Sequence, residues 1–441
     1  MMGAVSDPLL DNVVDTLSDQ ATGRRLPRAL TPFRTPAYRW LAVALSFSSF
    51  AGGVWLVGLV WEVFRLGGGP AQLSLVTTAS AVGVMIPLLL AGAVADRVRQ
   101  KLILLTVATI EMCGMAVAAL LSAAEWSSVP ALTAVAFAMG VTMAFYHPAY
   151  SAMLPSLVPA EDLMAVNGFE GMVRPAIGQA IGPAVAGLAI GAWAPSAAFG
   201  IAAAAMACSA LMLLRVPNVA VVPRLDEEHA GRPVRAAMAD MAEGFRYMLQ
   251  TPWLLATLLF ACLMLLAMMG PLEVLIPYLI KSDLGGDADD HARVLAAFGI
   301  GGALASLVMS SLPMPRRYLT ITTLAWGLSG LPFLLIAQAE NVWTVVGAGF
   351  VMGAMFSFPM VIWGTLLQRR VPPHLLGRVS SLDFFVSISL MPVSMALAGP
   401  VSQAIGMAPT FYVAALAPAV AAVLAVLWGK LPADEIANPL T

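Results

Sequence analysis

The charged residues of this chain are confined to short segments between long apolar runs. The run from Ser74 to Ala95 contains no Asp, Glu, Lys or Arg, and the run from Leu102 to Ala124 contains only Glu111. As a helix, each run is long enough to cross about 30 Å of hydrocarbon. The loop between them, Gly92–Lys101, carries four charges. A short charged loop between two such runs is typical of a membrane hairpin.

Composition extends this interpretation to the whole chain. Of the 441 residues, 60% are hydrophobic and only 11% are charged, which excludes an ordinary soluble protein with a polar surface. The net charge of −2 and the absence of a basic tract predict no nucleic-acid partner. Cys113, Cys208 and Cys262 lie in apolar runs without a CxxC motif, and the four histidines are scattered, so we expect neither a metal site nor a cofactor.

Windowed hydropathy predicts an all-α polytopic membrane protein with twelve transmembrane helices. We expect two six-helix bundles, 37–214 and 251–429, joined by a cytoplasmic connector, 215–250, that contains an amphipathic helix at Pro233–Leu249. Cytoplasmic tails are expected at 1–36 and 430–441. The predicted spans are Tyr38–Phe64, Leu73–Ala95, Leu102–Ala123, Val129–Leu154, Val166–Trp193, Ala197–Leu214, Trp253–Ile280, Val294–Leu312, Leu319–Ala337, Val342–Leu367, Val379–Gly399 and Phe411–Trp428.

The basic residues predict the orientation. Of the 23 Lys and Arg residues, 19 fall on the side of both termini, and Arg174 lies inside a span. Only Arg65, Lys281 and Arg293 fall on the other side. Because basic loops stay in the cytoplasm, both termini are expected there.

The two halves also repeat each other in sequence. Phe145-Tyr146-His147-Pro148 is followed by Val158-Pro159, as Phe356-Ser357-Phe358-Pro359 is followed by Val371-Pro372. A Gly-Pro pair then occurs in each following span, at Gly182-Pro183 and Gly399-Pro400. This order predicts two pseudo-repeated bundles in parallel orientation, with the substrate site at their interface.

Two groups of motifs resemble a known family. The loop with Gly92, Asp96, Arg97 and Lys101 resembles the signature between the second and third helices of the major facilitator superfamily, although Arg99 stands where that signature has Gly. The segment from Phe145 to Asn167, Glu243-Gly244-Phe245-Arg246-Tyr247 and Gly377-Arg378-Val379 are similar to the branch that contains bacterial enterobactin exporters and related efflux proteins. The resemblance implies the major facilitator fold and export of hydrophobic or amphipathic molecules by proton antiport.

The fifth span carries a small-residue motif, Gly178-x-x-x-Gly182-Pro183-x-x-x-Gly187, similar to the antiporter motif of export members. Small residues every four positions present a flat helix face, and proline removes an amide and bends the helix. We expect a partner helix to pack closely and pivot here, and plain small-residue packing stays open as the alternative.

Ionisable residues inside spans are candidates for function because their burial is costly. Glu111 lies midway along the third span, and Glu170 and Arg174 are four residues apart in the fifth, where they can pair on one face. These three are the candidates for proton coupling, and a purely structural ion pair is the alternative for the last two. Glu273, after Gly270-Pro271, is expected near the outer mouth.

The loop Gly92–Lys101, which we call the opening loop, is interpreted as a conformational gate. The free amides at the start of the eleventh span attract an anion, and Asp96 is positioned to supply it. Arg97 or Arg99 can contact Asp383 across the same interface between the two bundles. The predicted gate residues are Gly92, Asp96, Arg97, Arg99, Lys101, Arg378 and Asp383.

Aromatic and sulfur-containing residues are candidates for the substrate cavity, because methionine and aromatics can line an adaptable pocket. Lipid-facing or packing roles are the alternative, since methionines crowd the seventh and tenth spans generally. The candidates for the cavity are Tyr146, His147, Glu273, Met352 and Phe356.

A monomeric secondary transporter in a bacterial inner membrane is the favoured function, with a small molecule, protons and the lipid bilayer as partners. A lipid or lysolipid flippase of the same fold, or a nutrient importer, stays open. An ATP-driven pump is disfavoured because the chain has no G-x-x-x-x-G-K-[ST] motif, and an enzyme because no acid-base or metal cluster gathers at one depth.

Overall fold

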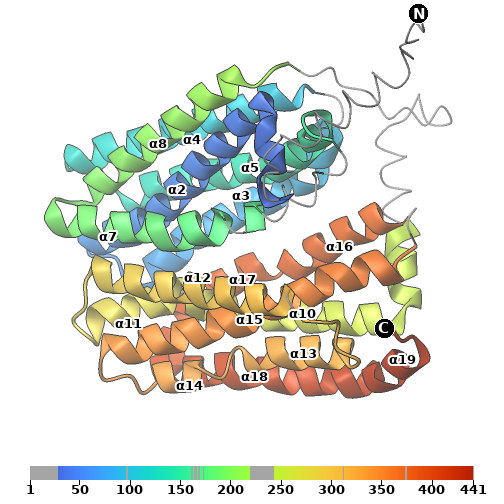
Figure 1. The fold of residues 1–441 in the computed structure, drawn as a ribbon. Helices are drawn as coiled ribbons and strands as arrows, with labels where there is room; N and C mark the ends of the chain where they lie inside the picture. Colours follow the sequence, from blue (N-terminus) through green and yellow to red (C-terminus); the bar gives the residue numbers. More distant parts are fainter. Residues whose placement is uncertain are drawn as a thin grey trace, which may run out of the picture.

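The computed structural model describes residues 28–95, 98–159, 162, 166, 169–171, 173–218, 243–310, 312–372 and 375–440. Within these ranges the chain is helical without strands, and twelve helices are long and apolar enough to cross a membrane. They form two six-helix bundles (Figure 1), so the predicted fold class is confirmed.

The N-terminal bundle begins with a short 3₁₀ segment, η1 (Arg28–Arg34). Serine caps its fourth span, because the Ser128 hydroxyl accepts from the Ala131 amide, and proline stands in the first turn of most of its helices, where it costs no hydrogen bond. The helices are α2 (Pro36–Arg65), α3 (Pro70–Ala95), α4 (Gln100–Ala123), α5 (Val129–Met153) with η2 (Leu154–Ser156), η4 (Arg174–Ile181) with α7 (Gly182–Ala192), and α8 (Pro195–Arg215).

The C-terminal bundle holds the other six spans and ends in a short helix, α19 (Leu431–Ala437). The helices are α10 (Pro252–Gly270) with η6 (Pro271–Leu275) and α11 (Ile276–Ser282), α12 (Ala288–Ser310), α13 (Tyr318–Leu328) with α14 (Phe333–Ile336), α15 (Val342–Arg370), α16 (Leu376–Ile388) with α17 (Met391–Ile405), and α18 (Met407–Trp428).

Two spans contain a π-helical segment. In the fifth span η4 begins at Arg174, and its second residue is Pro175. In the seventh span η6 begins at Pro271. Proline lacks the amide that the regular i to i−4 ladder needs, and π segments inside α-helices often occur at functional sites. Both segments carry a charged side chain, Arg174 and Glu273 respectively.

The repeat predicted from the sequence is visible in the packing of equivalent helices. In the N-terminal bundle, a methyl group added at Gly140 of α5 would lie 2.1 Å from the Ser80 carbonyl oxygen of α3. In the C-terminal bundle, one added at Gly353 of α15 would lie 2.0 Å from the Phe298 carbonyl oxygen of α12. The second and fourth spans therefore approach backbone to backbone in the same way in each half.

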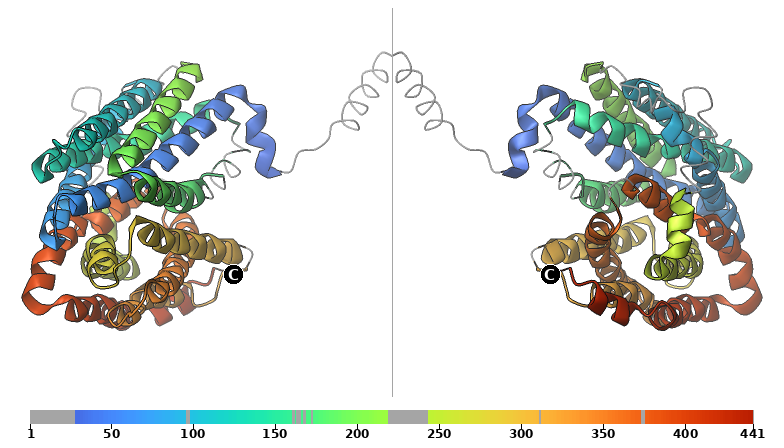
Figure 2. Two further views of the ribbon diagram at one scale, coloured as in Figure 1. Left: turned by 90° about the vertical axis from the view of Figure 1, so that its left-hand side faces the viewer. Right: turned by 90° about the vertical axis from the view of Figure 1, so that its right-hand side faces the viewer.

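The ends of the two bundles differ. We call the end that carries η1 and α19 the tail end, and the other the opposite end. Figure 1 shows the bundles together at the opposite end and diverging toward the tail end, and Figure 2 shows them as two separate groups of helices. At the opposite end the Lys281 ammonium donates to the Phe64 carbonyl oxygen at 3.1 Å, and the Gly399 amide donates to the Ser74 hydroxyl at 2.9 Å.

Pairs of small residues bring the bundles together there. Gly187 of α7 packs on the start of α12, where an added methyl group would lie 2.9 Å from the Asp289 Cα atom. Gly399 of α17 packs on the start of α3, 2.7 Å from the Pro70 carbonyl oxygen by the same measure. Gly182, in contrast, packs inside its own bundle against Phe50. The sequence repeat aligns Gly399 with Gly182. In its contacts, however, Gly399 matches Gly187, because both of these glycines pack against the other bundle.

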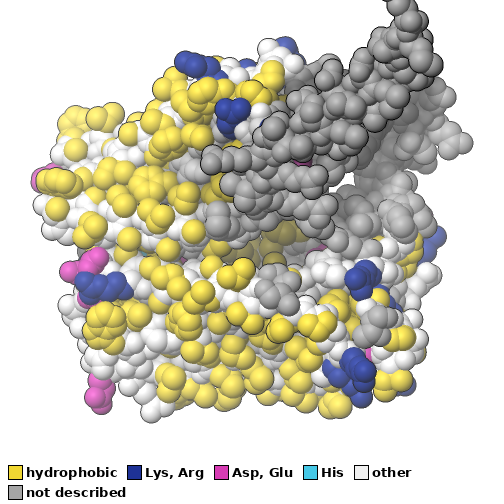
Figure 3. Space-filling view, in the orientation of Figure 1, with side chains coloured by type: hydrophobic (Ala, Val, Ile, Leu, Met, Phe, Trp, Pro, Cys, Tyr) yellow, Lys and Arg dark blue, Asp and Glu magenta, His cyan; other side chains and the backbone are white. Residues whose placement is uncertain are grey.

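The visible face is apolar between the two ends (Figure 3). Large side chains such as Leu188, Leu307 and Leu424 are more than half exposed. A broad apolar surface around helices of spanning length is what a bilayer-embedded protein needs. The N-terminal tail up to residue 27 and residues 219–242 of the connector lie outside the described residues, and residues 243–250 are helical.

Candidate functional site

A cavity of about 420 Å³, with a mainly apolar wall, lies inside the N-terminal bundle. Five spans contribute to its wall, and the polar groups sit among large apolar side chains that include Trp55, Met115, Met139 and Met143. The polar and charged lining residues are Ser48 and Ser49 of α2, Ser80 of α3, Glu111 of α4, Tyr146 of α5, and Arg174 and Gln179 of η4. An apolar pocket with a few convergent polar groups is typical of a small-molecule site.

Glu111 faces this cavity. The residue is 9% exposed, and its Oε1 atom accepts a hydrogen bond from the Thr142 hydroxyl at 3.1 Å. That hydroxyl also lies 2.7 Å from the Met139 carbonyl oxygen, so its single proton is shared between the two acceptors. Within the described residues Glu111 forms no ion pair. A carboxyl group without a counter-charge inside a membrane bundle is costly when ionised, so this group is suited to gain and lose a proton.

Glu170 and Arg174 pair as their spacing predicts, with 3.5 Å between Oε2 and Nη2. The Arg174 guanidinium also lies 5.9 Å from the centre of the Tyr146 ring, which stacks on Tyr150. The Glu170 side chain is 14% exposed and that of Arg174 is 32% exposed. Arg174 therefore lines the cavity, whereas Glu170 does not.

The small-residue motif packs the fifth span against two neighbours. A methyl group added at Gly53 of α2 would lie 2.1 Å from the Gly178 carbonyl oxygen, so these helices touch through their backbones. Gly187, one helix further along, contacts α12 of the other bundle. The motif thus joins the wall of the cavity to the contact between bundles.

The other substrate-cavity candidates are spread over several places. Tyr146 lines the cavity described above, and Glu273 lines a second, smaller one between the bundles. His147 is exposed and meets the Tyr146 ring edge-on. The Phe356 carbonyl oxygen accepts from the Trp326 indole at 2.9 Å. Met352 is 1% exposed and lines neither cavity.

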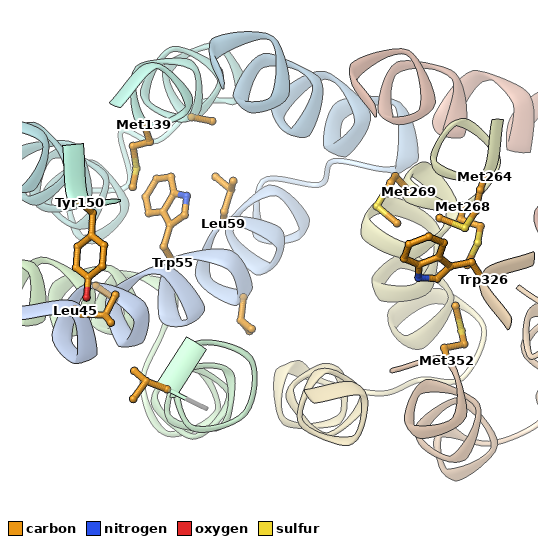
Figure 4. Close-up of a cluster of buried hydrophobic side chains, with 14 of the residues drawn as sticks. Leu45, Trp55, Leu59, Met139, Tyr150, Met264, Met268, Met269, Trp326 and Met352 are labelled. Carbon is orange, nitrogen blue, oxygen red and sulfur yellow. The ribbon is translucent and has the colours of Figure 1, made fainter. Parts of the chain in front are cut away.

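Figure 4 shows that Met352 belongs to a cluster in the C-terminal bundle, where Met264, Met268 and Met269 surround Trp326. A separate group in the N-terminal bundle contains Trp55 and Met139. These four methionines therefore lie in the core of the C-terminal bundle.

The predicted gate is described only in part. Asp96 and Arg97 lie outside the described residues, and the side chains of Gly92 and Arg378 are likewise not described. Arg99 is exposed at the start of α4. The Lys101 ammonium donates to the Leu214 carbonyl oxygen at 3.0 Å and also to that of Val216, at the end of α8.

Asp383 has a partner within its own bundle, because its Oδ2 atom accepts from the Trp363 indole at 3.0 Å. The described contacts of Lys101 and of Asp383 therefore each lie within their own bundle.

A model of the transmembrane secretion effector family matches residues 28–440. The chain belongs to this family of the major facilitator superfamily. It is therefore a transporter rather than an enzyme, and it groups with efflux transporters. The family match spans both bundles and the cavity residues.

Relatives and solved structures agree with this assignment. The chain is 26% identical over 423 residues to the multidrug efflux pump Tap of Mycolicibacterium fortuitum, covering 92% of this chain and 98% of Tap. It is 25% identical over 267 residues to macrolide efflux protein A of Enterococcus faecalis, covering 59% of this chain and 79% of that protein.

Among solved structures, the nucleoside transporter NupG has a TM-score of 0.65 at 16% identity, covering 90% of this chain and 99% of NupG. A POT family transporter bound to a thioalcohol-conjugated peptide has a TM-score of 0.68 at 13% identity, covering 90% of this chain and 96% of that transporter. These identities are low, so the two structures show the fold alone.

Sequence reasoning missed several residues of this transporter's cavity. Gln179 lines both cavities, and Ser48 and Ser80 line the larger one. A signal existed, because glutamine in the middle of an apolar span is costly to leave facing lipid. Its position inside the small-residue motif, one residue after Gly178, drew the interpretation toward packing instead.

Proposed function

We propose that this transporter exports hydrophobic or amphipathic small molecules in exchange for protons. The observation that carries the proposal is the cavity in the N-terminal bundle, where Glu111 and Arg174 face a wall of Trp55 and methionine side chains. Apolar walls suit varied amphipathic substrates, because the thioether side chain adapts its shape. The relatives named as efflux pumps support the direction of transport.

The contrast between the two ends of the molecule supports transport by alternating access. Contacts such as Lys281 with Phe64 close the opposite end, while the bundles diverge toward the tail end. With both termini in the cytoplasm, as the basic residues predict, this arrangement is the inward-open state. Export requires the bundles to rock so that the opposite end separates and the tail end closes.

Glu111 and the pair Glu170–Arg174 are the proposed groups for proton coupling. A proton on Glu111 removes a buried charge, and its loss restores that charge beside the substrate path. Substrate and proton can then compete for the same cavity, which is the requirement for antiport.

The opening loop is the proposed gate at the tail end, with Asp96 facing the first amides of the eleventh span and Arg97 or Arg99 facing Asp383 when that end is closed. When the bundles rock open toward the cytoplasm, these contacts must separate. We place the working protein as a monomer in a bacterial inner membrane, and its substrates among drugs or siderophores.

A lipid or lysolipid flippase is the second candidate function. A groove of about 950 Å³ between α10, α17 and α18 favours it, because the lining side chains from Leu259 to Trp428 are almost all apolar and match an acyl chain. The same reconstituted protein tests both candidates when lipid analogues are included beside drugs and siderophores.

The deciding experiment is transport by the purified protein in proteoliposomes with an imposed pH gradient. We expect gradient-driven movement of cationic dyes or siderophores that collapses with a protonophore. Glu111→Gln should abolish the dependence on the gradient while downhill exchange of substrate continues. If Glu111→Gln and Glu170→Gln both leave the rate and its pH profile unchanged, the assignment of the proton site is wrong.

A further inference from the structure

Between the two bundles, near the closed opposite end, lies a second cavity of about 110 Å³. Its wall is formed by α2, η4 and α7 of the N-terminal bundle and by η6, α11, α12 and α15 of the C-terminal bundle. Among the described residues that line it, Glu273 and His291 are the titratable ones. Closing the opposite end is what encloses these two groups.

Neither group has a hydrogen-bond partner among the described residues. The His291 side chain is 4% exposed, and its Nδ1 atom is buried without a partner. Glu273 forms no ion pair within the part of the chain that is described. The ring nitrogen of His291 and the carboxyl group of Glu273 border the same small space. One proton held between a carboxyl oxygen and Nδ1 would satisfy both groups.

The charged groups on the surrounding elements are already engaged elsewhere. On α12, Arg293 pairs with Asp289 and Asp290. Lys281 of α11 donates to the Phe64 carbonyl oxygen. On α2 Arg65 pairs with Glu62, and beside η4 Arg174 pairs with Glu170. No described cation is therefore in contact with Glu273, so ionisation of this carboxyl group is not compensated inside the closed interface.

We infer that Glu273 and His291 form a proton-binding site that couples protonation to closure of the opposite end. The proton comes from water on that side while the bundles are apart, and it binds a carboxylate oxygen of Glu273. In the closed interface the resulting O–H donates to Nδ1 of His291. A neutral, hydrogen-bonded pair can be enclosed at low cost, whereas an ionised carboxylate without a counter-charge is costly to enclose.

Release of the proton toward the tail end passes Gln179. This side chain and Gly178 line both this cavity and the larger one in the N-terminal bundle, so the two spaces meet at η4. Once the proton has left, the ionised Glu273 favours separation at the opposite end and completes an exchange cycle. The inference rests on the proposed proton-coupled export, to which it adds the place where the proton enters.

The test measures distances across the opposite end, which do not depend on transport. Spin labels at cysteines replacing Gln72 of α3 and Gln403 of α17 report whether the bundles touch there. In the otherwise unaltered protein, the ratio of closed to open distances should fall roughly tenfold from mildly acidic to mildly alkaline buffer. Glu273→Gln, permanently neutral, should stay closed at every pH.

Two substitutions at His291 separate the acceptor role from simple packing. His291→Asn keeps an acceptor near the position of Nδ1 and should retain most of the pH response, whereas His291→Phe fills the space without one and should lose it. Glu340→Gln, at an exposed acid before α15 on the same end, is the matched control and should behave like the parent.

The inference is overturned if Glu273→Gln responds to pH as the parent does, or if the parent does not respond at all. Transport in proteoliposomes judges the proposed function separately. A pH response that depends on Glu273, without proton-driven export, would keep the site and reject the coupling to export.

Discussion

The interior of the N-terminal bundle holds a cavity bordered by Glu111, Arg174 and Tyr146, whereas the interior of the C-terminal bundle is filled by Met264, Met268 and Met352 around Trp326. Both bundles have the same arrangement of helices, with matching backbone contacts at Gly140 and Gly353. The same arrangement of helices therefore encloses two different interiors, which we call the two fillings: a cavity with charged and polar groups in the N-terminal bundle, and a packed methionine core in the C-terminal bundle. In the N-terminal bundle the space between helices is left open and lined by charged and polar groups, whereas in the C-terminal bundle the equivalent space is closed by packed apolar side chains.

The shared scaffold gives the largest expected effect. A methyl group added at Gly53 would lie 2.1 Å from the Gly178 carbonyl oxygen. One added at Gly270 would lie 2.3 Å from the Ser394 carbonyl oxygen. Gly53→Ala and Gly270→Ala must push a helix aside, so each should cost at least about 1–3 kcal/mol of stability and most of the folded protein. Melting followed by size-exclusion chromatography in detergent measures this loss.

Matched controls come from glycines with open space around them, Gly200 in the N-terminal bundle and Gly347 in the C-terminal bundle. Their change to Ala should be neutral or slightly stabilising, because Ala is the better helix former. If Gly53→Ala is disruptive and Gly270→Ala is not, the two scaffolds are not equivalent.

The charged filling should give the next largest effect. Arg174→Ala leaves Glu170 without its ion-pair partner although its side chain is only 14% exposed, and we expect efflux to fall at least about tenfold. Replacing both residues by Gln removes the unpaired charge, so folding should recover even though transport does not. Efflux that recovers fully in the double variant would show that the pair is structural only.

The fold could be predicted from the sequence because it depends on two simple properties, the length of the apolar runs and the positions and signs of the charges. Hydrocarbon thickness fixes the length of a run such as Leu102–Ala123, and the structure places α4 there at Gln100–Ala123. The spacing of Glu170 and Arg174 fixed their pairing, because residues four apart share a helix face.

The site was harder because it depends on helix rotation and partner helices. Nothing in an apolar helix such as α4 tells which way Glu111 points, since the surface facing lipid is as apolar as the core. The π segment η4 changes the register of the fifth span after Arg174 and places Gln179 between two cavities. Met352 and Met139 are chemically identical, and only the packing assigns one to a core and the other to a cavity wall.

The contact between the bundles at the tail end should give a several-fold effect. Asp96→Asn removes the anion proposed to meet the start of the eleventh span, an interaction of about 0.3–1 kcal/mol when exposed. We expect fewer molecules closed at the tail end and slower turnover, with folding and substrate affinity retained. Spin labels on the tail ends of the second and eleventh spans measure this, and an unchanged distance distribution would rule out the latch.

The smallest effect distinguishes the two fillings at a pair of methionines. Met139 lines the cavity of the N-terminal bundle, whereas Met352 is 1% exposed in the core beside Trp326. Met→Leu conserves volume, so each substitution should cost less than about 1.5 kcal/mol of stability. Only Met139→Leu removes an adaptable thioether from the cavity wall, so it alone should change the relative efflux of substrates of different shape. A panel of dyes of graded size measures the ratio for each variant against the parent. If Met352→Leu changes the substrate preference as much as Met139→Leu does, then Met352 contacts substrate in another state of the cycle, and the C-terminal bundle contributes to binding after all.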